Sequence, residues 1–79
     1  MLHNIIELYP DETFLIADGF DDAIIGIDQS EMRLIYSISK MIEILSHDMS
    51  EFDAIEHIEY NVTSAYVGEK TPIWCYDNF

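Results

Sequence analysis

The sequence predicts an α+β domain, in which two main helices pack on one face of a small three-stranded antiparallel sheet and short helices lie at the N-terminus. Three observations lead to this fold class. The stretch Ser50–Gly68 has the capping signals and apolar periodicity of an amphipathic helix. Residues 23–38 have the alternation and turn signals of a β-hairpin, and Thr71–Tyr76 is typical of one more strand. Because a two-stranded hairpin is marginal alone, the last strand is expected to join it.

The N-terminal residues predict two short helices. Residues 2–9 place apolar side chains at helical spacing, which indicates the first of them. Pro10 suits the first position of the second helix, and Gly19 lies beyond its expected end. A strand over Thr13–Ile16 is the competing interpretation of this second helix.

The hairpin follows. Ala23–Ile27 is short and rich in β-branched residues, Asp28–Glu31 is turn-like, and Met32–Ile38 alternates in the manner of a strand. The even-numbered residues of the second strand share one face, and Ile25 and Ile27 share a face of the first. One side of the hairpin is therefore strongly apolar, and the helices are expected to cover it.

Two helices are expected between the hairpin and the last strand. The first begins at Ser39, with an apolar stripe that runs from Ile38 to Leu45. The second is capped by Ser50 and ends at residue 66 or 67, with Gly68 in the left-handed position that closes many helices. At about 3.6 residues per turn, its core face comprises Ala54, Ile55, Ile58, Val62, Ala65 and Tyr66.

Length and composition fit one domain, residues 1–79, because a hydrophobic fraction of 49% is ample for a core. The longest apolar runs are too short to span a bilayer, and the N-terminus lacks the basic region of a signal peptide. A cytosolic protein is therefore expected. Cys75 is the single cysteine, which excludes an intramolecular disulfide and suits a reducing compartment.

The charge balance is the most unusual property of the composition. Sixteen acidic residues stand against three basic ones, which gives a formal net charge of −13. This sign excludes nonspecific attraction to nucleic-acid phosphates and to anionic membrane surfaces. The expected charged partners are basic protein surfaces, not nucleic acid or membrane.

An acidic turn raises the question of a Ca²⁺ or Mg²⁺ site. Asp18, Asp21 and Asp22 surround Gly19, and Asp28 follows the first strand. An EF-hand loop needs oxygen ligands at alternate positions followed by a glycine and a distal glutamate, and this spacing is missing. A solvated turn is therefore expected, and neither a metal site nor a cofactor is predicted.

Catalytic constellations are also missing from the sequence. His47 and His57 each lie near an aspartate, but no nucleophile and no water-excluding pocket is placed beside either of them. One cysteine and three scattered histidines lack the ligand spacing of a zinc site. The chain is therefore not expected to be an enzyme, and no catalytic residue is assigned.

The acidic surface is the predicted partner-binding site. Carboxylates one helical turn apart stand about 5–6 Å from each other, close to the phosphate repeat along one nucleic-acid strand. Such a face can occupy a basic groove, and an outward-pointing tyrosine among the acids is a candidate interface anchor. The alternative is that the charge only keeps a small apolar-rich domain soluble. The predicted site comprises Asp18, Asp21, Asp22, Asp28, Glu51, Asp53, Glu56, Glu59 and Tyr60.

Two stretches carry a resemblance to known proteins. They are ADGFDDAIIGID, residues 17–28, and EYNVTSAYVGEKTPIW, residues 59–74. Both resemble a group of small acidic proteins encoded in bacteriophage genomes, a group with no established activity. The resemblance implies a phage accessory gene whose product acts in the cytoplasm of the bacterial host. In charge and size alone, the chain is also similar to DNA-mimicking anti-CRISPR and anti-restriction inhibitors.

These observations lead to two functional hypotheses. The leading one is a phage inhibitor of a bacterial defence enzyme that handles nucleic acid, either a CRISPR effector or a restriction enzyme. Its acidic, nucleic-acid-mimicking surface is expected to bind the basic groove of that host protein. The alternative is a non-enzymatic phage interaction or regulatory module in which acidity serves solubility. The first hypothesis allows a monomer or a homodimer, and the second suits a homodimer.

Overall fold

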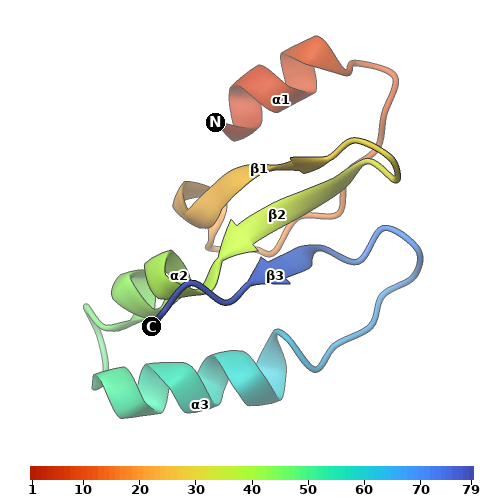
Figure 1. Cartoon of the computed structure of the whole chain (residues 1–79). Coiled ribbons are helices and arrows are strands. Elements are labelled where there is room, and N and C mark those ends of the chain that lie inside the picture. The colour runs from red at the N-terminus through yellow and green to blue at the C-terminus, as the bar shows by residue number, and fades with distance from the viewer.

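The computed structural model describes residues 1–79 and confirms the α+β class (Figure 1). No helix is long and apolar enough to cross a membrane. In chain order the elements are α1 (Leu2–Leu8), the 3₁₀ turn η1 (Asp21–Ala23), β1 (Ile24–Asp28), β2 (Arg33–Ser37), α2 (Ile38–Leu45), α3 (Glu51–Asn61) and β3 (Ile73–Cys75).

The sheet is mixed, whereas the sequence predicted a purely antiparallel one. β2 is central, β1 pairs with it antiparallel, and β3 pairs with it parallel. The cause is the connection between β2 and β3, in which α2 continues from the end of β2 and α3 runs back along the sheet (Figure 1). An 11-residue helix and a five-residue strand both span about 16 Å. The chain thus re-enters the sheet at the end where β2 began, so β3 must run in the direction of β2.

A β-bulge decides which residues of β1 reach the core. The register shifts between Ile24 and Gly26, so that Ile24 pairs with Tyr36 while Ile27 pairs with Leu34. Without the bulge, Ile24 and Ile27 would lie on opposite faces; with it, both share the core face of β2. The expectation that Ile25 faces the core is therefore wrong, and its side chain is 38% exposed.

Tyr36 lies at the centre of the core, fully buried in the middle strand. Its ring centroid lies 5.5 Å from that of Trp74 in β3, and its hydroxyl accepts a 2.8 Å hydrogen bond from the backbone N–H of Ala17. Burial raises the pKa of the phenol, which keeps it neutral at physiological pH. The surrounding core residues are Ile5, Phe20, Ala23, Ile24, Leu34, Ile38, Met41, Ile42, Ala54 and Ile58.

The segment before η1 is extended, so the second N-terminal helix predicted from Pro10 is wrong. A turn at Pro10–Asp11 is followed by residues 12–17 without regular secondary structure. The competing strand over Thr13–Ile16 does not form either, because these residues pair with no neighbouring strand. In Figure 1 this segment leads from α1, at the β1 edge, behind the sheet to η1. An extended chain covers about 3.3 Å per residue against about 1.5 Å in a helix, so the extended form gives the longer reach between α1 and η1.

The C-terminal tail caps α2. The Asp77 carboxylate accepts a 2.6 Å hydrogen bond from the Ser37 hydroxyl and a 2.9 Å bond from the Ser39 N–H. The Ser37 hydroxyl accepts the Lys40 N–H at 3.2 Å, so α2 begins one residue earlier than its predicted start at Ser39. The Ser37 hydroxyl and the Ser39 N–H hold the pKa of Asp77 below its ordinary value.

The start of α3 agrees with the sequence and its end does not. The Ser50 hydroxyl accepts the Asp53 N–H at 3.1 Å, which confirms the predicted N-cap. The helix ends at Asn61, about one and a half turns before the predicted end at residue 66 or 67. The Thr63 N–H bonds to the Ile58 carbonyl five residues back, which interrupts the regular helical pattern, and the Ser64 hydroxyl bonds to the Tyr60 carbonyl.

Beyond α3, residues predicted to extend its core face lie in a loop. Ala65 is exposed, and so is Tyr66 at 75%. Gly68 does take a positive φ of 115°, but in a turn before β3 and not at the end of the helix. Thr71 holds this turn, because its hydroxyl donates to the Gly68 carbonyl at 2.6 Å and accepts the Val67 N–H at 3.0 Å.

Tyr36→Phe removes the hydroxyl that binds Ala17 and keeps the buried ring. The Ala17 N–H then loses its partner, and we expect the free energy of unfolding to fall by about 1–2 kcal/mol. Urea denaturation measures the change. Tyr60→Phe, which removes an exposed hydroxyl, is the matched control and should stay within about 0.5 kcal/mol of the wild type. Equal effects of the two substitutions would contradict the role given to Tyr36.

Asp77→Asn tests the C-terminal cap through the pH dependence of stability. The pKa of Asp77 is lower in the folded than in the unfolded chain, so its stabilisation is present above about pH 4 and is lost as the pH falls through the folded value. The difference in unfolding free energy between wild type and Asp77→Asn should therefore shrink on acidification. Asp48→Asn, at an exposed aspartate that accepts no side-chain hydrogen bond, is the control. A difference that stays constant with pH would show that the carboxylate is not the stabilising group.

Candidate partner-binding surface

The exposed side of α3 combines acidic and aromatic side chains. At about 100° per residue, Phe52, Glu56 and Tyr60 form one line along the helix, with Asp53 and Glu59 on either side of it. All five are exposed, and the two rings rank among the most exposed large apolar side chains of the chain, Phe52 at 70% and Tyr60 at 77%. We refer to these five residues as the α3 face. The core is packed against the opposite side of the helix, through Ala54 and Ile58.

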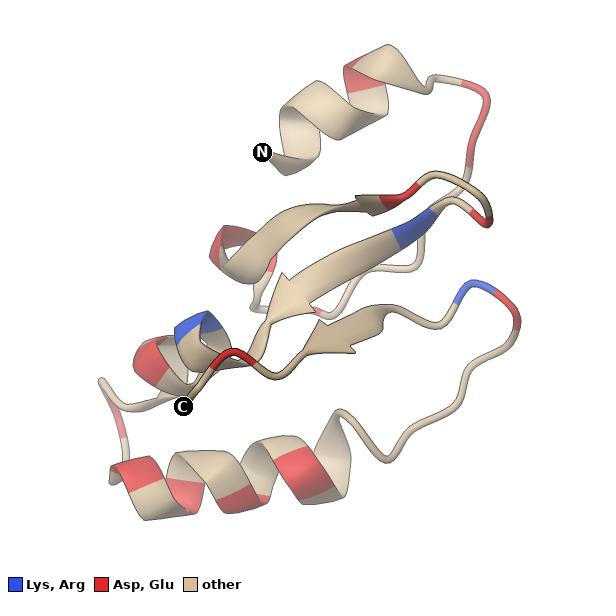
Figure 2. Cartoon of the chain, in the orientation of Figure 1, with Lys and Arg blue, Asp and Glu red and all other residues tan.

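The carboxylates of the α3 face have no cationic partner within the chain. The Arg33 guanidinium binds Glu31 at 3.1 Å and the Thr71 carbonyl at 2.7 Å. The Lys70 ammonium binds Glu12 at 3.1 Å, and Lys40 forms no ion pair. Figure 2 shows acidic positions along the length of α3 and no basic one on it. The chain therefore leaves the negative charge of this helix uncompensated.

The other predicted acids lie elsewhere. Asp18, Asp21 and Asp22 lie at and before η1, which contacts α2. Asp28 ends β1 and holds its turn, since one carboxylate oxygen accepts the Ser30 hydroxyl at 2.9 Å. Glu51 is in the first turn of α3, on the side that faces the α2 end of the molecule, where it shares a hollow with residues of α2. The structure thus brings together Asp53, Glu56, Glu59 and Tyr60 from the predicted set, and it joins Phe52 to them.

No three His, Cys, Asp or Glu side chains converge on a point where they could hold a metal ion. The turn around Gly19 accordingly presents its aspartates separately. His57, in α3, lies 3.4 Å from the Asn61 amide through Nδ1 and is exposed.

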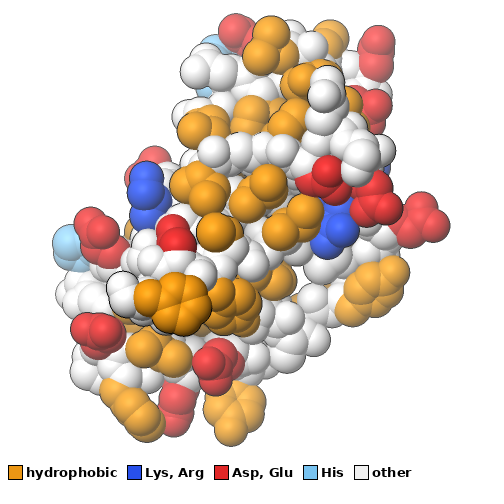
Figure 3. Space-filling model, in the orientation of Figure 1, with side chains coloured by type: hydrophobic (Ala, Val, Ile, Leu, Met, Phe, Trp, Pro, Cys, Tyr) orange, Lys and Arg blue, Asp and Glu red, His pale blue; other side chains and the backbone are white.

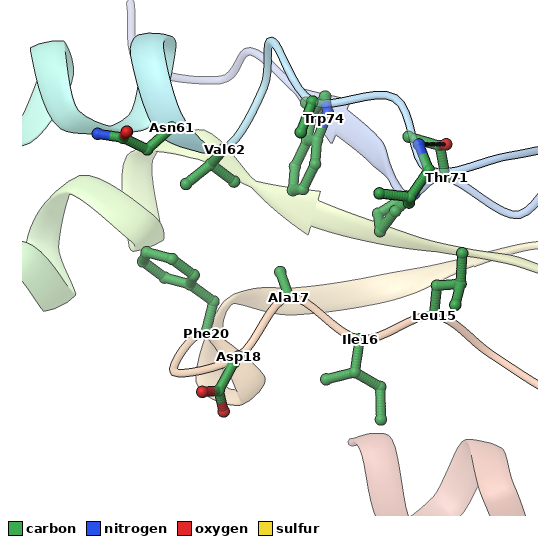
Figure 4. A pocket seen from close by; sticks show the side chains of 12 residues that line it. Leu15, Ile16, Ala17, Asp18, Phe20, Asn61, Val62, Thr71 and Trp74 are labelled. Atoms are coloured by element: carbon green, nitrogen blue, oxygen red, sulfur yellow. Dashed lines mark hydrogen bonds between the residues drawn. The ribbon is translucent and has the colours of Figure 1, made fainter.

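An apolar groove lies at the C-terminal end of α3. It has a volume of about 390 Å³, and its walls come from the extended segment before η1, the end of α3 with the loop beyond it, and the start of β3. Figure 4 shows Phe20, Val62 and Trp74 directed toward this space from three different parts of the chain. The sequence interpretation missed the groove because it placed Val62 and Ala65 in a continuous helix. Once α3 ends at Asn61, the loop swings aside and leaves the hollow.

The face of the sheet opposite the helices is also apolar. Gly26, Ile35 and Ile73 lie side by side across the three strands, and they alternate with core-facing residues. Ile25 is exposed beside this row, and Cys75 is half-buried next to Ile73. Figure 3 shows hydrophobic side chains gathered over the strands on this side, with acids toward the rim. We refer to Ile25, Ile35, Ile73 and Cys75 as the outer sheet face.

Comparison of the chain with protein-family models, with curated proteins and with solved structures finds no match. The interpretation of the surface therefore depends on its own geometry and charge.

Proposed function

We propose that the protein is a phage-encoded inhibitor of a bacterial enzyme that acts on nucleic acid in host defence, a CRISPR effector or a restriction enzyme. It binds the basic nucleic-acid groove of that enzyme with the α3 face. The observation that carries this proposal is the combination of three uncompensated carboxylates with two protruding aromatic rings on one helix side.

The two kinds of side chain have separate roles in such binding. A net charge of −13 raises the rate of encounter with a basic groove, because long-range attraction steers the two proteins together. Carboxylates about one helical turn apart then meet cationic groups that are spaced to bind phosphates. Phe52 and Tyr60 bury apolar surface at the contact and give the specificity that charge alone lacks.

The phage origin and the defence target are supported by a sequence resemblance and by the size and acidity of the chain. Residues 17–28 and 59–74 resemble small acidic phage proteins, and small size combined with extreme acidity is similar to nucleic-acid-mimicking inhibitors. The bacterial cytoplasm is the compartment in which such a target is found. None of the three cationic residues lies in α3, so a nucleic acid is not a suitable partner for the α3 face itself.

A second candidate function is supported by the outer sheet face. An interaction or regulatory module that forms a homodimer would need an apolar, self-complementary surface, and the outer sheet face provides an exposed Ile25 beside the half-buried Ile35 and Ile73. Acidity then only maintains solubility. In such a dimer, added salt would strengthen association by screening the repulsion between two negative chains, which is opposite to its effect on binding to a basic groove.

Charge reversal on α3 separates the two candidates. The tagged chain captures proteins from nuclease-treated bacterial lysate at low salt, and mass spectrometry identifies them. We expect capture of a nucleic-acid enzyme, release of that enzyme by added DNA or RNA, and at least about tenfold weaker capture by the double variant Glu56→Lys, Glu59→Lys. Glu7→Lys with Glu43→Lys changes the net charge equally at exposed positions of α1 and α2, and it is the matched control.

The homodimer candidate predicts a different outcome from the same variants. The two charge-reversed chains would behave like each other, because both lower the net negative charge equally, whereas Ile35→Ser would abolish association of the chain with itself, measured by sedimentation. Equal capture by the α3 variant and the control, with no release by nucleic acid, would contradict the inhibitor proposal.

A further inference from the structure

A short stretch before η1 has a free backbone. Thr13–Ile16 is extended, and none of its N–H or carbonyl groups is hydrogen-bonded within the chain. The first bond beyond it is from the Ala17 N–H to the Tyr36 hydroxyl, which fixes one end of the stretch on the core. Its residues are those of a β-strand, and such a stretch with unpaired backbone groups is a template for a further strand.

The free backbone lies against the apolar groove. Leu15 and Ile16 line the groove together with Val62, Ala65 and Trp74. In Figure 4, Leu15 and Ala17 point to one side of the extended chain and Ile16 to the other, which is the alternation of a strand. A peptide paired with this stretch would therefore place an apolar side chain in the hollow beside it.

The charges around the stretch decide what kind of peptide fits. Lys70 lies over the Phe14 ring, but its charge is paired with Glu12. Asp11, two residues before the stretch, and Asp18, two residues after it at the groove wall, have no cationic partner within the chain. A second copy of this chain, with its net charge of −13, would be repelled. A segment with lysine or arginine on either side of an apolar residue is complementary to both the charge and the apolar groove.

We propose that Thr13–Ile16 and the groove bind an extended basic segment of the partner protein by β-strand addition. The backbone of the segment pairs with Thr13–Ile16, its apolar side chain enters the groove, and its flanking cations approach Asp11 and Asp18. The proposal rests on the function proposed above, because it assigns the groove to the same basic partner as the α3 face. The groove begins at Asn61 and Val62, directly after Tyr60 at the C-terminal end of the α3 face, so a partner that extends past the end of the helix contacts both.

Peptides provide the test, because the partner is unidentified. The full chain is used to select from a displayed library of random short peptides, and the enriched peptides are synthesised with blocked ends. We expect an apolar residue flanked by lysine or arginine, and amide NMR signals of Thr13–Ile16 that shift on binding. Methylation of the central backbone nitrogens of a peptide should weaken its binding about tenfold, because the ladder donors are lost while the side chains remain.

Filling the groove is the complementary change in the protein. Ala65→Phe places a ring in the hollow from an exposed position, so the core is left intact, and it should lower peptide affinity at least about tenfold. Ser64→Phe adds the same ring to the neighbouring residue outside the groove. It removes only the exposed hydrogen bond from the Ser64 hydroxyl to the Tyr60 carbonyl, and it should bind like the wild type. The proposal would be overturned if no peptide is enriched. It would also be overturned if neither Ala65→Phe nor backbone methylation changes the peptide affinity.

The same variants distinguish failure of this inference from failure of the proposed function. If Ala65→Phe captures the nucleic-acid enzyme normally while charge reversal of Glu56 and Glu59 prevents capture, the groove assignment is wrong and the function stands. If neither change affects capture, both are wrong. Loss of capture with Ala65→Phe but not with Ser64→Phe supports the groove as part of the partner-binding site.

Discussion

The structure depends on the burial of Tyr36 in the central strand. Its backbone pairs with Ile24 of β1 on one side and Trp74 of β3 on the other, and its hydroxyl binds the Ala17 N–H. A buried hydroxyl must keep a hydrogen-bond partner, because leaving it unpaired costs about 1–3 kcal/mol. One residue thus joins the three strands, through its backbone, to the extended segment that leads to η1, through its hydroxyl. That segment forms a wall of the groove, so the position of a candidate binding site depends on the same interaction.

The excess of acidic residues determines which groups the surface around this core exposes to solvent. With 16 acids and three cations, few carboxylates can be paired, and the ion pairs of Arg33 and Lys70 lie away from α3. The acidic side chains of α3 are therefore exposed without a cationic partner, next to the exposed rings of Phe52 and Tyr60. The early end of α3 opens the groove at the C-terminal end of this helix, where Asn61 and Val62 line it directly after Tyr60 of the α3 face.

Much of the fold could be predicted from interactions between residues that are close in the sequence. The parts that could not be predicted depend on contacts between residues that are far apart in it. The Ser50 cap, the hairpin and the acids exposed along α3 follow from neighbouring residues, whose spacing and hydrogen bonds act over a few positions. The bulge at Ile25 and the direction of β3 depend on register and on the path between strands, which no short window of sequence specifies. The groove escaped prediction for the same reason, since apolar spacing continues through Ala65 although the helix does not.

The most direct test of the central claim is the affinity of the chain for the nucleic-acid enzyme proposed as its partner, measured over a range of salt concentrations with and without duplex DNA or guide RNA. If the α3 face occupies the nucleic-acid groove, the association constant falls steeply as salt rises, and nucleic acid competes for the enzyme. An association constant that does not change with salt, in a complex that binds nucleic acid at the same time, would contradict the claim.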